Sequence, residues 1–366
     1  MKILLLPGAF KGSLSALRAG HILHKQLSNN HTTKMFPIAD GGDGFIDCFQ
    51  TLYPDATLIY TYAKNAFLRT RKTSFLILPD HKTAVIETAR ICGLGSAKPR
   101  ELDPLGASSF GVGQVLMQAV KHGAKKIFIG LGGVACNDGG CGLAVACGAI
   151  VFDKHGKLLP LGAKPLLQAA QIDLSALKKR FKGVQLIGCV DVTNPLLGAR
   201  GSARVFGPQK GATPTQVKIL EKSLTRWARV LKNTGHDIAH IPSCGAAGAI
   251  AAGLVGCFDG RLLLGADFLQ QKAHLAHYVK WADLVITTEG KLDAQTFYGK
   301  APLTVINLAR QYKKPVLFIC GSADWKHLKK QNLSGVCVAE LVDFAPSLQH
   351  AKKHAGTYLA RVCKNI

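Results

Sequence analysis

Apolar runs typical of buried strands alternate with helix-like stretches along almost the whole of this 366-residue chain. Such alternation favours an α/β protein with largely parallel sheets, because a helix must return the chain between two parallel strands. The clearest predicted strands are residues 3–6, 83–87, 126–129, 185–189, 284–287, 315–320 and 336–340. The clearest predicted helices are residues 14–26, 111–122, 215–232, 302–311 and 347–363.

The composition suits a globular protein of about two domains. Hydrophobic residues make up 48% of the chain and charged residues 19%, so it can bury a large core. Lys and Arg number 46 against 22 Asp and Glu, a net charge of +24. This excess is spread along the chain, and it lacks the aromatic, finger or heptad patterns of nucleic-acid binders. We therefore expect an anionic small molecule as the partner, and no nucleic acid.

The cysteines indicate a reducing compartment. There are eleven of them, an odd number, and no pair has the C-x-x-C spacing of a metal or redox site. We expect no secretory signal in the first residues, because only four apolar residues lie between Lys2 and Pro7. The uncharged run 241–258 contains Pro242 and several glycines, so we expect a buried loop and helix there. A cytoplasmic protein with no membrane segment is the expectation.

Five strand-like runs end in polar or glycine-rich turns. In α/β proteins, ligands bind at the carboxyl ends of strands, so these turns are the candidate functional positions. Four of the five carry carboxylates, although acid-bearing turns also occur as purely structural turns. The turns are residues 7–13, 39–44, 130–142, 191–195 and 287–293.

The turn at 130–142 is the richest in glycine, with six glycines among its thirteen residues. A glycine-rich corner between a strand and a helix presents backbone N–H groups to an anion, usually a phosphate. A tight turn that binds nothing is the alternative interpretation. The sequence has neither a Walker A motif nor a G-x-G-x-x-G dinucleotide motif, so phosphate handling would use neither of those loops.

At these turns the sequence resembles the bacterial glycerate kinase family, the type related to kinases of glycerate and galactarate catabolism. Residues 6–16 resemble its opening A-P-D-S-F-K-G-S-L-S-A. Six further motifs follow in order: A-D-G-G-E-G-T, G-G-S-A-T-N-D-G-G-A-G, D-V-x-N-P-L, F-G-P-Q-K-G-A, G-A-A-G-G-x-G-A-G-L and A-D-L-V-I-T-G-E-G-x-L-D-x-Q-T-x-x-G-K-A-P. They are similar to residues 39–45, 132–142, 191–196, 206–212, 245–254 and 282–302. The resemblance extends from residue 2 to about residue 322.

The resemblance implies two different α/β domains with the active site in the cleft between them. One domain is flavodoxin-like, a doubly wound parallel sheet, which we expect to comprise residues 1–65 and 280–366; residues 66–279 form the other. The implied activity is phosphorylation of D-glycerate by ATP and Mg²⁺ to phosphoglycerate, with 2-phosphoglycerate favoured. The partners are then glycerate and ATP, and a homodimer remains open.

Phosphoryl transfer requires charge neutralisation, an in-line hydroxyl and a proton acceptor. Asp191 directly follows a strand and precedes Asn194-Pro195, so we take it as the base. Lys11 is the second predicted catalytic residue, since a lysine at a strand-to-helix corner can hold a carboxylate or phosphate. The predicted substrate-binding residues are Ser13, Asp40, Asp43, Asn194 and Lys210. The predicted nucleotide- and phosphate-binding residues are Gly132, Gly133, Asn137, Asp138, Gly139, Gly140 and Lys300, and the predicted Mg²⁺ ligands are Glu289 and Asp293.

Several positions depart from the family pattern. Gly8 and Ala9 replace an aspartate and a serine, and Val134 and Cys136 replace a serine and a threonine, so hydrogen-bonding groups are lost on predicted ligand-facing loops. Two family glycines are Ala249 and Ala251, and residues 65–67 lack the family's P-L-G turn. These departures leave two alternatives: a kinase of a related small hydroxy acid, and a catalytically silent homologue that binds a nucleotide or metabolite.

Overall fold

The computed structural model describes residues 1–39, 41–265, 275–297, 301–328, 331–364 and 366. The chain divides into two compact units, one formed by Met1–Pro54 with Leu264–Ile366 and the other by Asp55–Leu263. These divisions differ from the sequence-based divisions at 65/66 and 279/280. The first boundary falls at residues 54/55, before the predicted one, because residues 57–64 form a strand that pairs within the second unit.

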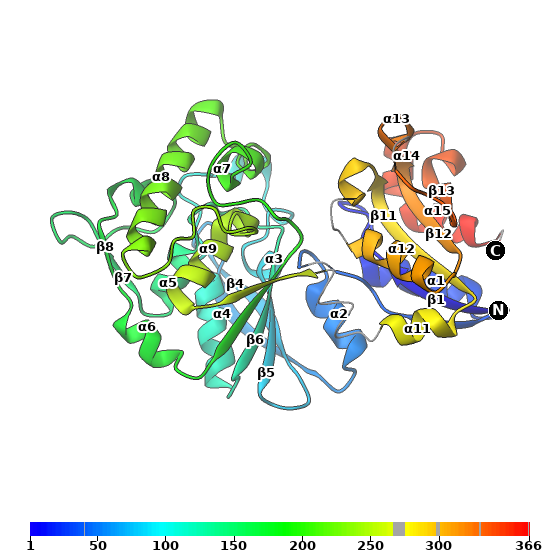
Figure 1. Cartoon of the computed structure of the whole chain (residues 1–366), viewed down its shortest axis with the longest axis horizontal. Coiled ribbons are helices and arrows are strands. Elements are labelled where there is room, and N and C mark those ends of the chain that lie inside the picture. Colours follow the sequence, from blue (N-terminus) through cyan, green and yellow to red (C-terminus); the bar gives the residue numbers. More distant parts are fainter. Residues whose placement is uncertain (40, 266–274, 298–300, 329–330, 365) are drawn as a thin grey trace. The chain divides into compact units, whose positions relative to one another are not determined.

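The first unit contains a five-stranded parallel sheet with the order β13-β12-β11-β1-β2 (Figure 1). Numbered within the unit, this is the 2-1-3-4-5 order of flavodoxin-like doubly wound sheets. The two ends of the chain build it together, because β1 lies between β2 and β11. The strands are β1 (Lys2–Pro7), β2 (Thr32–Met35), β11 (Leu284–Leu292), β12 (Val316–Ala323) and β13 (Val336–Glu340).

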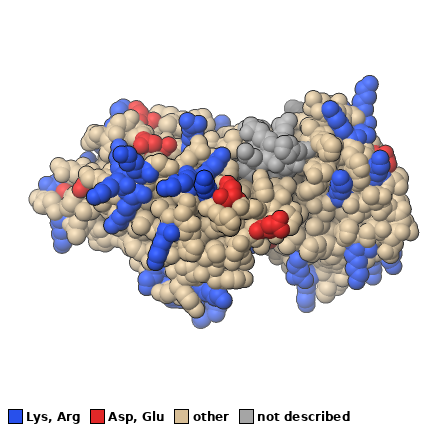
Figure 2. Space-filling view, turned by 90° about the horizontal axis from the view of Figure 1, so that it is seen from below, with Lys and Arg blue, Asp and Glu red and all other residues tan. Residues whose placement is uncertain are grey.

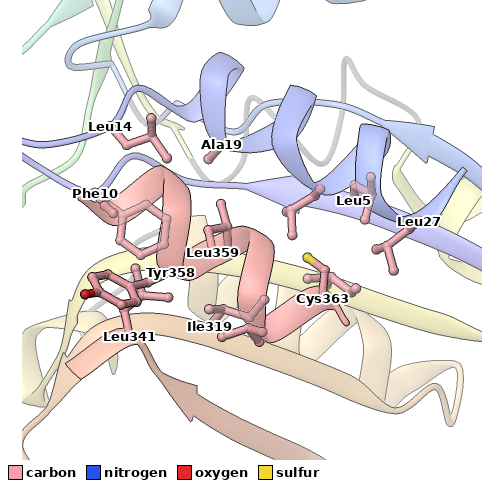
Figure 3. Close-up of a cluster of buried hydrophobic side chains, with 14 of the residues drawn as sticks. Leu5, Phe10, Leu14, Ala19, Leu27, Ile319, Leu341, Tyr358, Leu359 and Cys363 are labelled. Atoms are coloured by element: carbon pink, nitrogen blue, oxygen red, sulfur yellow. The ribbon is translucent and has the colours of Figure 1, made fainter. Parts of the chain in front are cut away.

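Helices pack against this sheet through apolar faces. In α1 (Ala16–Leu27), buried residues recur at the three- and four-residue spacing of one helix face, and the Ser15 hydroxyl caps the first turn. Figure 3 shows this face meeting α15 (Ala355–Cys363) and the apolar side chains of β1 and β12. The remaining helical segments are α2 (Phe45–Leu52), α11 (Leu275–Trp281), η4 (Ala294–Phe297), α12 (Ala301–Gln311), α13 (Trp325–Leu328), η5 (Leu341–Phe344) and α14 (Leu348–Lys353).

The second unit contains a six-stranded mixed sheet with the order β10-β9-β6-β5-β4-β3. β5, β6 and β9 are parallel, whereas β3, β4 and β5 form an antiparallel meander. The strands are β3 (Thr57–Lys64), β4 (Thr70–Ile77), β5 (Thr83–Glu87), β6 (Lys126–Leu131), β9 (Gln185–Val190) and β10 (Arg261–Leu264), with β7 (Ile150–Phe152) and β8 (Gln171–Asp173) forming a separate pair.

The longest helix of the second unit is α8 (Pro214–Lys232), which begins with a capping box made by Thr213 and Gln216. α9 (Ala246–Phe258) is almost entirely buried, as its uninterrupted apolar sequence predicts. The other helical segments are α3 (Thr88–Cys92), η1 (Pro99–Glu101), α4 (Phe110–Lys121), α5 (Cys141–Ala146), η2 (Lys164–Gln168), α6 (Ser175–Arg180), α7 (Ser202–Phe206) and η3 (Pro208–Lys210).

The α/β fold class predicted from the alternating pattern is confirmed, and all seven clearest strands occur. Two details of the prediction are wrong. The helix predicted over residues 347–363 is two helices, α14 and α15, because the chain leaves helical geometry at His354. The predicted turn at 287–293 lies mostly inside β11, because this strand continues to pair with β12 through Leu292.

The surface is basic, with Lys and Arg outnumbering Asp and Glu on the face shown in Figure 2. All eleven cysteines are free thiols, and only Cys337 is exposed. Among the helices of the described residues, none is both long enough and apolar enough to cross a membrane.

Candidate active site at the strand ends

The second unit gathers three of its polar turns at one sheet edge. β5, β6 and β9 are neighbouring parallel strands, so their carboxyl ends meet at the same edge. Thr88 follows β5, the glycine corner follows β6 and Asp191 follows β9. Two turns predicted from separate parts of the sequence, 130–142 and 191–195, therefore lie at one edge of this sheet, together with Thr88.

Asp138, in the glycine corner, has a fully buried carboxylate. Its Oδ2 accepts hydrogen bonds from Ser108 Oγ at 2.9 Å, from Ser109 N at 2.7 Å and Oγ at 3.0 Å, and from Gly142 N at 3.2 Å. Its Oδ1 makes no hydrogen bond within the described residues. Burial raises the pKa of Asp138, although the hydrogen bonds to Oδ2 favour the ionised form. The carboxylate thus joins the start of α4 to the start of α5.

Asn137 is also enclosed, with 1% of its surface exposed. Its Nδ2 donates to the Pro104 carbonyl at 3.3 Å, and its Oδ1 accepts from Lys210 Nζ at 3.0 Å. Lys210 is 2% exposed and also donates to the Cys136 carbonyl at 2.6 Å. Desolvation lowers the pKa of Lys210. The side chains of Asn137 and Lys210 therefore bond to the protein itself.

The glycines of the corner allow close backbone approach. Gly139 has φ +64° and its carbonyl accepts a 2.9 Å hydrogen bond from Trp227 Nε1, while Gly140 has φ +73° and packs against Gly253. Gly132 N donates to Thr88 Oγ1 at 3.3 Å, and Gly139 N donates to the Gly248 carbonyl at 3.2 Å. These two amides bond within the protein. Gly133, with φ +64°, is exposed.

Asp191 and Asn194 belong to the turn after β9. Asp191 is half-buried. Asn194 Nδ2 donates to the Arg200 carbonyl at 2.7 Å, and the Asn194 carbonyl accepts from Gly245 N at 2.9 Å. These bonds fix the turn and connect it to the segment that leads into α9.

The first unit carries Lys11 and Ser13 in a tight turn after β1. The turn is closed by hydrogen bonds between the backbones of Phe10 and Leu14, and Gly12 supplies its φ of +75°. Lys11 is exposed at the tip, where its ammonium is accessible to an anion. Ser13, although also exposed, donates from Oγ to the Lys352 carbonyl.

Glu289 and Asp293 lie at the carboxyl end of β11, next to β1. Thr296 Oγ1 donates to Glu289 Oε2 at 2.8 Å and accepts from Asp293 N at 3.3 Å. Lys291 Nζ lies 3.8 Å from Asp293 Oδ2. Within the part of the chain that the structure describes, no three His, Cys, Asp or Glu side chains group as metal ligands. Two partly buried carboxylates near one strand end nevertheless suit Mg²⁺, which takes one or two carboxylates and completes its shell with phosphates and water.

Three further predicted residues lie in the first unit. Asp43 is exposed, just before α2. Asp40 and Lys300 lie outside the described residues.

The departures from the family pattern are accommodated by packing. Val134 and Cys136 are buried, at 2% and 0% exposure. At Gly8, an added Cβ would lie 2.5 Å from the Thr288 carbonyl oxygen, and Gly8 N donates to that oxygen at 3.1 Å. The aspartate that the family has at this position therefore requires the backbone to move away from β11.

Sequence reasoning missed several residues that shape the edge of the second unit. Ser108 and Ser109 immediately precede α4. Trp227 lies in α8, 88 residues from its partner Gly139. None of them belongs to a quoted motif. The Ser-Ser pair just before a helix was a usable signal, because serine favours helix N-termini.

Comparison with known proteins identifies relatives of this chain. The profile of the glycerate kinase family matches residues 3–366. A glycerate kinase of Halalkalibacterium halodurans is 34% identical over 369 residues, covering 100% of this chain and 97% of that protein. A glycerate 2-kinase of Escherichia coli K12 is 36% identical over 326 residues, covering 88% of this chain and 85% of that protein.

The fold has a solved counterpart. The crystal structure of a candidate glycerate kinase 2 from Salmonella typhimurium LT2 matches with a TM-score of 0.79 and 32% identity, covering 100% of this chain and 98% of that one. The resemblance predicted from the motifs is thus confirmed over the full length, and the chain belongs to the glycerate kinase family.

Proposed function

We propose that this protein transfers the γ-phosphoryl group of ATP to D-glycerate, with the 2-hydroxyl as the favoured acceptor. The observation that carries the proposal is the full-length family match, together with the position of most of the motifs at the carboxyl ends of strands. Relatives that share this pattern are named glycerate kinase and glycerate 2-kinase.

In this proposal, the residues predicted at the strand ends take separate roles in the reaction. Lys11 is exposed at a strand end, so its ammonium can neutralise the glycerate carboxylate or a phosphate. Asp191 accepts the proton of the attacking hydroxyl, held in place by the hydrogen-bonded turn around Asn194. Glu289 and Asp293 would hold Mg²⁺, which neutralises phosphate charge when bound.

The remaining predicted residues take supporting roles in the proposal. Ser13, Asp40 and Asp43 orient glycerate together with Asn194, and Lys300 contributes to nucleotide binding. The exposed part of the glycine corner, at Gly133, is the part best able to approach a phosphate. Because Asn137 and Asp138 are bonded to other segments, we assign them to support of the corner.

The burial of Val134 and Cys136 favours glycerate as the phosphoryl acceptor over a related hydroxy acid. Both side chains pack inside the unit. Their change from hydroxyl residues therefore alters packing more than it alters a ligand-facing surface. The carboxylate lost at Gly8 and the hydroxyl lost at Ala9 change the chemistry of a strand end, and a related hydroxy acid is the alternative that they support.

The test is an ADP-release assay with ATP, Mg²⁺ and D-glycerate. We expect glycerate-dependent turnover that Asp191→Asn and Lys11→Ala each reduce by about 10³-fold or more. The exposed residues Asp55 and Lys25 provide matched controls, so Asp55→Asn and Lys25→Ala should retain wild-type turnover. The product is identified by phosphorus–proton coupling in NMR, which distinguishes the 2-phosphate from the 3-phosphate.

Two results would contradict the proposal. Turnover with another small hydroxy acid but not with D-glycerate would support the retuned kinase. A rise in melting temperature with ATP but no turnover with any acceptor would indicate a silent nucleotide-binding homologue.

A further inference from the structure

Lys210 places an ammonium group inside the second unit, at the end of η3. Its Nζ donates to the Cys136 carbonyl at 2.6 Å and to Asn137 Oδ1 at 3.0 Å. A buried charge is tolerated only where polar partners replace its water. With 2% of its surface exposed, Lys210 is bonded to the glycine corner and not presented to solvent.

The same ammonium lies against an unusual backbone segment near the start of α9, where the chain departs from helical geometry. Ala247, Gly248 and Ala249 all have positive φ, at 52°, 60° and 64°. A Cβ added at Gly248 would lie 2.8 Å from Lys210 Nζ and 1.9 Å from the Cys136 carbonyl oxygen. Alanine in this conformation is strained, and such strain persists only where surrounding contacts hold the backbone. Lys210 and the glycine corner supply such contacts.

Gly245, two residues before the left-handed segment, contacts the turn after β9. Gly245 N donates to the Asn194 carbonyl at 2.9 Å, and a Cβ at Gly245 would lie 2.3 Å from the Pro195 carbonyl oxygen. Residues 245–249 are therefore in contact with Lys210 on one side and with the Asp191–Asn194 turn on the other. A single chain of contacts thus connects the end of β6, Lys210, residues 245–249 and the end of β9.

We infer that Lys210 is a positioning residue, which fixes the glycine corner after β6 and, through residues 245–249, the turn that carries Asp191. The inference rests on the proposed function, since Asp191 is the base only in that reaction. It removes Lys210 from the substrate-binding group in which the sequence placed it. A buried lysine whose donors face protein acceptors orients other groups and does not contact glycerate.

Steady-state kinetics of Lys210→Met test this assignment. Loss of the ammonium should misplace Asp191, so we expect kcat to fall about 100-fold, with KM for glycerate and ATP within about threefold of wild type. Lys218→Met makes the same chemical change at an exposed lysine of α8 and should match wild type. Lys210→Gln keeps an N–H donor, and we expect it to recover part of the lost kcat.

Two kinetic outcomes would overturn the inference. An increase of more than about tenfold in KM for glycerate, with kcat retained, would mean that Lys210 binds the substrate. A lower melting temperature with an unchanged kcat per folded molecule would mean that Lys210 serves stability alone. If Lys210→Met does not fold, Lys210→Gln and Asn137→Ala, which removes one acceptor of the ammonium, provide the same comparison.

Hydrogen exchange tests the inference independently of activity. In Lys210→Met, we expect faster amide exchange over residues 136–139 and 245–249, and none of this change in Lys218→Met. Unchanged exchange over 245–249 would break the proposed connection between the two strand ends. If the wild type itself shows no glycerate kinase activity, the proposed function fails, and the exchange result still decides the role of Lys210.

Discussion

At the residue scale, Asp138 illustrates how a buried carboxylate can be structural within a functional motif. Helix N-termini favour negative charge, and here the carboxylate of the protein occupies such a position between the first residues of α4 and α5. Asp138 thus accepts hydrogen bonds of the kind that we expected a bound phosphate to accept. The pattern of glycines predicted the anion-binding geometry but did not indicate which anion fills it.

The raised pKa of Asp138 gives a pH prediction. Between the unfolded pKa of about 3.8 and the higher folded value, the folded protein binds more protons than the unfolded chain. The contribution of Asp138 to stability therefore falls as pH rises through the folded pKa. Asp138→Asn cannot ionise, so its free energy of unfolding relative to wild type should rise by about 1.4 kcal/mol for each pH unit between the two pKa values.

Urea unfolding of both proteins at a series of pH values measures this difference. Comparing the two proteins cancels the groups whose pKa is lowered, such as Asp80 and Asp153. A difference that does not change with pH would mean that Asp138 titrates alike in the folded and unfolded states.

Ala249 gives a second prediction at this scale. It has φ +64° at a position where family members have glycine. Ala249→Gly should relieve the left-handed strain and raise the free energy of unfolding by about 0.5–1 kcal/mol. This value is net of the conformational entropy that glycine adds to the unfolded chain. Ala251→Gly, within the helical part of α9, should do the reverse and destabilise by about 1 kcal/mol or more. Thermal unfolding of the two variants checks the opposite signs.

At the scale of elements, α8 shows how a helix remote in sequence supports the strand-end edge. Trp227 is fully buried on this helix and donates to the carbonyl of Gly139, whereas Thr213 caps the exposed first turn. Trp227 therefore supports the glycine corner, whereas Thr213 stabilises the helix itself.

Substitutions at these two positions should therefore differ in their effect on turnover. Trp227→Phe leaves a buried carbonyl without its donor and should destabilise by about 1–3 kcal/mol, with a lower kcat because Gly139 belongs to the corner. Thr213→Ala should cost about 1 kcal/mol through loss of the cap, with turnover per folded molecule unchanged. Melting curves and ADP-release rates separate the two effects; equal kcat values in both variants would contradict the support of the corner by α8.

At the scale of the whole molecule, connectivity determines which pieces can fold alone. Asp55–Leu263 is one continuous segment with its own six-stranded sheet. The other unit needs both ends of the chain, because β11 pairs with β1 as well as with β12.

We therefore expect the fragment 55–263 to fold alone with cooperative unfolding and no glycerate-dependent turnover, since it lacks Lys11 and Glu289. The fragment 264–366 should fail to fold, because β11 loses its neighbour and apolar surface covered by α1 becomes exposed. Circular dichroism and thermal scans of the purified fragments test both expectations. An unfolded 55–263 fragment would mean that this unit depends on the rest of the chain.

The sequence by itself determined the fold class, the main strands and the turns that follow them, because hydrophobic periodicity and glycine usage are local signals. It also determined the family, through motifs that occur in the family's order along the chain. It could not determine the extension of β11 to Leu292, since continued pairing with β12 depends on a neighbour distant in sequence. The break at His354 likewise interrupts a pattern that reads as one helix.

Only the tertiary structure decided which polar residues are accessible and which are enclosed. Lys11 and Lys210 look alike in sequence, as lysines beside glycine in polar turns, yet one is exposed and the other is buried against Cys136 and Asn137. The difference arises from segments up to 88 residues apart, which pack around the glycine corner. Burial and hydrogen-bond partners are properties of the assembled fold, so local patterns can nominate functional residues but cannot assign their roles.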